Sequence, residues 1–171
     1  MKMKKLVTAL ATAALLVGAP AASFAGEYKI GDLVIDNPQA RATPPGAPVS
    51  GGYLVIHNNG KEADRLVGGS ADFAGKVEIH EMAMDGEVMK MRELENGLEI
   101  PAGGEVTLKP GGYHVMFMEM KRNLEAGTTE KVTLRFQKAG DITMDFDVVD
   151  PGALKMNMNK NMNMNMNKNA N

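Results

Sequence analysis

The chain has 171 residues, of which 44% are hydrophobic, with a formal net charge of −2 and no cysteine or tryptophan. The absence of cysteine excludes disulfides, thiol redox chemistry, iron–sulfur clusters, cysteine-ligated zinc and the blue-copper centre, whose metal requires a thiolate. The 15 methionines are therefore the only sulfur-bearing side chains.

Residues 1–25 are organised like a secretory signal peptide. Three lysines precede an apolar run from Leu6 to Val17, and Ser23-Phe24-Ala25 places small residues at the two positions that a signal peptidase reads. The apolar run is shorter than the ~20 residues of a membrane-spanning helix, and no other stretch is long enough. We expect cleavage after Ala25 and an exported, periplasmic protein without a membrane span.

The chain after the signal peptide is expected to fold as one domain, residues 26–154, followed by a tail, residues 155–171. Its length of about 145 residues is enough to bury a core. Removing three lysines leaves a net charge near −5. Such a charge argues against nucleic acid as a partner.

Short segments of alternating apolar and polar residues recur at roughly ten-residue intervals along this domain. In chain order, the expected strands are Leu33–Ile35, Gly52–Asn58, Arg65–Gly68, Lys76–Met82, Val88–Leu94, Glu105–Lys109, Tyr113–Met118, Lys131–Gln137 and Asp141–Val149. Turn residues separate them, with Asp85-Gly86 as the clearest hairpin signal, and the prolines between Asn37 and Pro48 predict an irregular loop. The pattern is typical of an all-β sandwich or barrel with little helix.

Alternation assigns faces to two histidine-bearing strands, because successive side chains of a strand point to opposite sides. His80 shares a face with Glu78 and Met82. His114 shares a face with Met116. The face opposite these two is predicted to be apolar and is formed by Tyr113, Val115 and Phe117.

The spacing His80-x10-Met91-x22-His114-x-Met116 combines two imidazoles with two thioethers. Soft Cu(I) accepts both ligand types, whereas Mg²⁺ and Ca²⁺ prefer oxygen. The face on which Met91 lies cannot be read from alternation. The set predicts a surface-facing Cu(I) site whose affinity falls below about pH 6.5, because imidazole binds metal only when neutral.

Four segments carry a resemblance to a known family: Val77–Met82, Val88–Arg92, Ile100–Gly104 and Leu108–Met116. In sequence and spacing they resemble the periplasmic PCu(A)C copper chaperones, and the similarity runs through most of the mature domain. The interval between Met91 and His114 is one residue longer than is usual in that family. We place the extra residue in the turn at 95–97, where insertions are tolerated.

The resemblance implies a cupredoxin-like Greek-key β-sandwich that binds one Cu(I) through His80, Met91, His114 and Met116. It also implies delivery of copper to the dinuclear centre of cytochrome c oxidase, with subunit II or a Sco-type protein as the acceptor. We expect a monomer. We expect no enzymatic activity, because no nucleophile is paired with a base in the sequence.

Methionine in a strand is most often packing, since its flexible side chain fills gaps, and this alternative stays open for Met91. His57 has no methionine nearby in the sequence and is interpreted as a surface or hydrogen-bonded residue. Further methionines are interpreted mainly as packing or shielding, and some as a thioether path toward the site. These are Met82, Met84, Met89, Met118 and Met120.

The tail consists almost entirely of Asn, Met and Lys from Met156 onward. Such a composition cannot build a core and predicts disorder. The tail is either a solvated extension without a role or a mobile arm whose thioethers gather Cu(I) near the folded site.

Three functions are compatible with the sequence. The first is a Cu(I) chaperone. The second is a periplasmic copper buffer or resistance protein that stores Cu(I) on the Met-rich tail. The third is an interaction module in which the methionines only pack.

Overall fold

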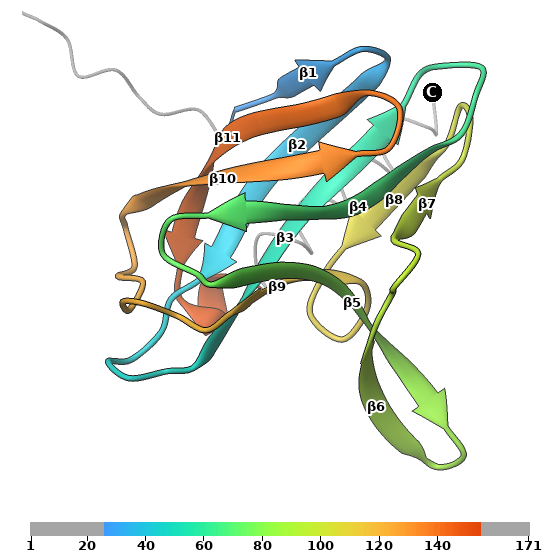
Figure 1. Ribbon diagram of the computed structural model, residues 1–171. Helices are drawn as coiled ribbons and strands as arrows, with labels where there is room; N and C mark the ends of the chain where they lie inside the picture. Colours follow the sequence, from blue (N-terminus) through green and yellow to red (C-terminus); the bar gives the residue numbers. More distant parts are fainter. Residues whose placement is uncertain (1–25, 155–171) are drawn as a thin grey trace, which may run out of the picture.

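The computed structural model describes residues 26–154, which form a curled β-structure of eleven strands (Figure 1). The strands are β1 Tyr28–Ile30, β2 Leu33–Arg41, β3 Val49–Asn58, β4 Asp64–Ala71, β5 Lys76–Asp85, β6 Val88–Glu93, β7 Leu98–Ile100, β8 Glu105–Leu108, β9 His114–Met118, β10 Thr129–Phe136 and β11 Gly140–Val149. A short helical turn follows at 151–154. The predicted signal peptide and tail lie outside the described residues.

The strands pair in the order β6-β5-β9-β3-β2-β11-β10-β4-β7, with β1 added beside β2 and β8 beside β3. Neighbours that are distant in the chain, such as β9 beside β3 and β11 beside β2, are the crossovers of a Greek-key arrangement. The β2–β11 pair is parallel, whereas the others are antiparallel. The predicted all-β, cupredoxin-like fold is confirmed.

The core lies between two layers of this curled sheet. In Figure 1, β4, β10 and β11 cross in front of β2 and β3. Phe117 of β9 contacts Phe146 of β11, with ring centroids 6.1 Å apart, although β3 and β2 separate these strands in the sheet order. Phe73 also contacts the ring of Phe117 edge-on, with ring centroids 5.0 Å apart. These contacts require the sheet to fold over onto itself, which makes the sandwich.

The predicted irregular loop at 37–48 is wrong in its first part, because β2 continues to Arg41. Asn37 adopts a positive φ of 51°, and the register with β3 shifts between Asp36 and Gln39. This is a β-bulge, a place where a sheet tolerates the missing N–H of Pro38. The strand resumes beyond it, and Ala40 pairs with Gly52.

Two strands of three residues, β1 and β7, were not predicted from the sequence. Three residues are too few to show an alternating pattern, although Leu98 and Ile100 of β7 are buried. Tyr113 was predicted to share the apolar face of β9, but it precedes the strand and is 38% exposed. Val115 and Phe117 are fully buried, as predicted.

The β5–β6 hairpin projects from the body of the domain (Figure 1). Asp85 pairs with Val88, so the connecting loop is only the two residues Gly86 and Glu87. Gly86 has a φ of 66° at the first loop position, which is the requirement of a type II′ turn. The hairpin predicted from Asp85-Gly86 is confirmed. It places Met91, on β6, next to β5, the strand that carries His80.

Candidate metal centre

The two candidate histidines are brought together by the pairing of β5 with β9. His80 and His114 are direct partners across these antiparallel strands, so their side chains leave the sheet on the same face. Their ring centroids lie 5.9 Å apart with an interplanar angle of 55°. Both residues are buried, with exposed fractions of 9% and 5%. The sequence predicted a surface-facing pair, but both side chains are largely shielded from solvent.

His114 is held as a neutral imidazole with a defined tautomer. Its Nδ1 lies 3.0 Å from the carbonyl oxygen of Gly112, and since only a protonated nitrogen can donate there, Nε2 carries the lone pair. Burial is the main cause of a lowered His114 pKa, and the charges of His80 and Arg41 act in the same direction, while the Gly112 bond opposes them. A neutral ring with a free lone pair is the form that binds a metal ion.

His80 is oriented by a carboxylate on its own strand. Its Nε2 lies 2.8 Å from Oε2 of Glu78, two residues back on the same face. If Nε2 donates to this carboxylate, the lone pair lies on Nδ1. Within residues 26–154, Nδ1 of His80 is the buried side-chain nitrogen or oxygen that has no hydrogen-bond partner. Such an orphaned acceptor is unfavourable unless a ligand completes it.

The two candidate thioethers lie on the same face, on opposite sides of the histidine pair. Met116 is two residues from His114 and is the direct partner of Glu78. Met91 is the direct partner of Met82, two residues from His80, so the pairing assigns the face that alternation could not. Both methionines are therefore diagonal neighbours of His80, at a Cα separation of about 7–8 Å that long side chains can bridge. Met91 is 49% exposed, whereas Met116 is partly buried.

No group of three or more His, Asp or Glu side chains in residues 26–154 is arranged to hold a cation. His57 contacts two carboxylates, with Nε2 3.1 Å from Asp36 and Nδ1 3.1 Å from Glu105, in agreement with its interpretation as a hydrogen-bonded residue. On a separate point, none of the helical structure in residues 26–154 has the length and hydrophobicity that crossing a bilayer requires.

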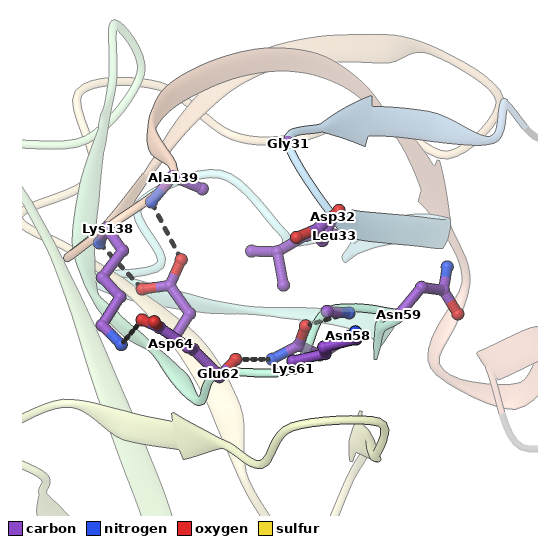
Figure 2. Close-up of a pocket in the computed structure, with 11 residues that line it drawn as sticks. Gly31, Asp32, Leu33, Asn58, Asn59, Lys61, Glu62, Asp64, Lys138 and Ala139 are labelled. Carbon is purple, nitrogen blue, oxygen red and sulfur yellow. Dashed lines mark hydrogen bonds and ion pairs between the residues drawn. The ribbon is translucent and has the colours of Figure 1, made fainter.

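A polar hollow of about 560 Å³ lies elsewhere, where the end of β3 meets the β10–β11 turn (Figure 2). Several of its polar groups are already engaged in hydrogen bonds or an ion pair. The carboxylate of Asp64 accepts backbone N–H bonds from Arg65, Lys138 and Ala139, and the Lys138 ammonium lies 2.9 Å from Glu62. The hollow is therefore better explained as a structural tie between β4 and the β10–β11 turn than as a binding site.

The sequence did not identify Glu78 as a functional residue, and the structure places it against His80. A signal was present, since a carboxylate two residues from a histidine on one strand shares its face. The sequence also left open whether the two histidine-bearing strands are neighbours.

Known proteins support this assignment of the fold. The family model described as "Putative lipoprotein LpqE-like" matches residues 33–148. "Putative lipoprotein Lxx21020" of Leifsonia xyli subsp. xyli is 35% identical over 91 residues, which cover 53% of this chain and 55% of that protein. "Uncharacterized protein RP573" of Rickettsia prowazekii is 32% identical over 84 residues, with shares of 49% and 46%. The matched part of the chain thus spans about half the length of these curated relatives.

Similar solved structures share the fold over about three quarters of the chain. The copper-bound PCuAC domain from PmoF2 has a TM-score of 0.63 and 28% identity, covering 74% of this chain and 99% of that one. The apo PCuAC domain from PmoF1 has a TM-score of 0.63 and 32% identity, covering 74% and 100%. Cu(I)-DR1885 from Deinococcus radiodurans has a TM-score of 0.58 and 25% identity, covering 74% and 83%.

The cupredoxin-like β-sandwich of this chain is the fold of the PCuAC copper-binding domains. The chain belongs to the LpqE-like family, which is the PCuAC family. The expected Cu(I) cargo is confirmed at this level, because two of the similar structures contain copper.

Proposed function

We propose that this protein is an exported copper chaperone that holds one Cu(I) with His80, His114, Met116 and Met91. The observation that carries the proposal is the facing histidine pair, in which each ring has one nitrogen engaged and one left with a lone pair. The ion would be held by Nδ1 of His80 and Nε2 of His114. Thioethers from the two flanking diagonal positions complete a soft, neutral ligand set suited to Cu(I).

The different exposure of the four residues suits a protein that carries copper and hands it on. The histidines are buried, whereas Met91 is half exposed on a projecting hairpin. A ligand of an acceptor protein would reach the ion most easily on that side and displace Met91 first. Because no ligand needs to leave as a charged group, the exchange of thioether for an incoming donor costs little desolvation.

The family description as lipoproteins supports export, and the sequence at 1–25 is in line with it. In the periplasm we propose that the acceptor is the copper centre of cytochrome c oxidase, in subunit II or through a Sco-type protein. The protein would act as a monomeric carrier and not as an enzyme. Mixing the Cu(I)-loaded chain with a soluble copper-binding domain of subunit II should move the ion to that domain, and failure to transfer would exclude direct delivery to subunit II.

A Cu(I) titration against a competing chelator tests the binding site. His114→Ala or Met116→Leu should lower the affinity by at least about tenfold, as removal of a metal-site residue typically does. His57→Ala is the matched control, because its ring contacts Asp36 and Glu105 instead. An unchanged affinity in the His114 and Met116 variants would overturn the proposed site.

Storage on the Met-rich tail is the second candidate function, favoured by the five methionines of 156–166. A chain that ends at Lys155 separates the two functions. The chaperone retains one Cu(I) without the tail, whereas a buffer loses most of its copper capacity.

A further inference from the structure

The β5–β6 hairpin carries four methionines on one face. Met82 is the direct partner of Met91, and Met84 is the direct partner of Met89, so the four thioethers form two successive rungs. His80 lies two residues beyond Met82 on the same face. The order from the hairpin tip inward is therefore the Met84–Met89 rung, the Met82–Met91 rung and then the histidine pair.

Packing does not explain the outer rung. Met84 and Met89 are 62% and 47% exposed, and neither belongs to the buried core cluster. Strands favour β-branched and aromatic residues. On this face, however, all four positions between His80 and the turn, two on each strand, are methionine. The identity of the side chain is therefore better explained by its sulfur.

The opposite face of the hairpin has a different chemistry. Lys90 forms an ion pair with Asp85, and Arg92 forms one with Glu81 at a distance of 2.6 Å. These residues occupy the alternate positions of both strands, so charge and thioether are separated onto two faces. The methionine face thus offers neutral soft donors with no carboxylate between the turn and Glu93.

The rungs have suitable dimensions for metal binding. Direct partners in an antiparallel pair have Cβ atoms about 4.5–5.5 Å apart, and three rotatable bonds let each methionine turn its sulfur toward the other. Successive rungs are about 6.6 Å apart along the strand, which places the outer rung about 13 Å from the histidine pair.

We propose that Met84 and Met89 form a second, thioether-only site for a soft monovalent cation, Cu(I), on the far side of the Met82–Met91 rung from the histidine pair. The ion would be captured at the exposed tip and passed inward. Capture stands on the hairpin geometry alone, whereas passage inward rests on the proposed function. Thioethers bind without losing a proton, so capture should be independent of pH between about 5 and 8.

The test uses the full chain with 13C-labelled methionine methyl groups and Ag(I), a redox-inert probe of the same soft class, in chloride-free buffer. The methyl signals of Met84 and Met89 should shift together and saturate. They should do so in the wild-type chain and also in the His80→Ala/His114→Ala variant, which lacks the histidine site. Absence of these shifts while Ag(I) binds elsewhere would overturn the capture site.

Met84→Leu/Met89→Leu keeps the apolar shape and removes both sulfurs. This variant should keep the equilibrium Cu(I) affinity of the histidine site but load it more slowly. Met120→Leu/Met144→Leu is the control that removes two thioethers outside the hairpin, and it should load at the wild-type rate. Equal loading rates in the two variants would overturn the capture role.

The two proposals fail in different ways. If the Met84 and Met89 signals respond but the histidine variants bind Cu(I) normally, the proposed function is wrong and the thioether site stands. If the histidine site binds Cu(I) but the methyl signals of Met84 and Met89 stay fixed, the thioether site is wrong and the proposed function stands.

Discussion

His80 depends on Glu78 for the direction in which its lone pair points. The carboxylate lies 2.8 Å from Nε2 and is 20% exposed, so it is partly shielded from water. Carboxylates in this position fix the tautomer and the ring orientation of a metal-binding histidine. We therefore propose that Glu78 positions His80 in the proposed copper site and is not itself a ligand.

Replacing Glu78 tests this role. Glu78→Ala should lower the Cu(I) affinity about 10–100-fold, and Glu78→Gln should restore part of it, because an amide oxygen still accepts the Nε2 hydrogen. Glu81→Gln, on the opposite face of β5, should leave the affinity unchanged. Competition with a Cu(I) chelator measures all three, and equal losses in the Glu78 and Glu81 variants would contradict a positioning role.

The protonation of His114 should influence how the proposed copper binding responds to acid. Its pKa is lowered mainly by burial, so the ring stays neutral to a lower pH than an ordinary histidine of pKa about 6.5. Protons should therefore compete with Cu(I) for this nitrogen only below that pH. Apparent Cu(I) affinity measured from pH 8 to pH 5 should be flat above about 6.5, and a steep fall already at pH 7 would be inconsistent with this.

At the scale of elements, the β5–β6 hairpin depends on one turn glycine. Gly86 has a φ of 66°, and a methyl group there would meet no atom within 4 Å, so the cost of a side chain is purely conformational. That cost is about 1–2 kcal/mol. The turn fixes the register that places Met91 diagonal to His80.

Gly86→Ala should loosen the hairpin without unfolding the domain. Amide hydrogen exchange should rise in β5 and β6, and Cu(I) should dissociate faster because Met91 is less well positioned. Gly31→Ala is the control, since Gly31 has a similar φ of 56° in open space at the β1–β2 turn. Its effect should be confined to that turn, and identical exchange profiles would refute the local effect.

At the scale of the whole molecule, Asp64 connects the start of β4 to the β10–β11 turn. Burial alone would raise its pKa, but the N–H bonds from Lys138, Arg65 and Ala139 outweigh burial, so the net pKa is lowered. A carboxyl group with a lowered folded pKa stabilises the fold above its unfolded pKa of about 3.9, and this contribution disappears as the pH falls through the folded pKa.

Asp64→Asn should therefore lower the free energy of unfolding by about 1–3 kcal/mol at pH 7 and flatten its dependence on pH in the acid range. Denaturant unfolding from pH 7 to pH 2 measures both effects. Asp85→Asn is the control, because its exposed ion pair with Lys90 should contribute little. An acid dependence unchanged by the Asp64 substitution would contradict its role.

Local patterns in the sequence were sufficient for much of this protein. Alternation predicted that His80 shares a face with Glu78, and that His114 shares one with Met116, because the direction of a strand side chain depends only on its position in the strand. Asp85-Gly86 predicted the hairpin, since a turn is specified by its own residues. The absence of cysteine and the ligand types selected a soft metal without any structural information.

Tertiary structure decided which strands are neighbours. The pairing that places His80 opposite His114 joins residues 34 apart in the chain, and no local pattern encodes such a choice because pairing depends on the whole sheet. The β5–β6 register gave Met91 its face, the fold buried both histidines, and the β2–β3 pairing continues past a bulge at Asn37. The candidate ligands could thus be identified in the sequence, whereas their arrangement on one face is a property of the folded sheet.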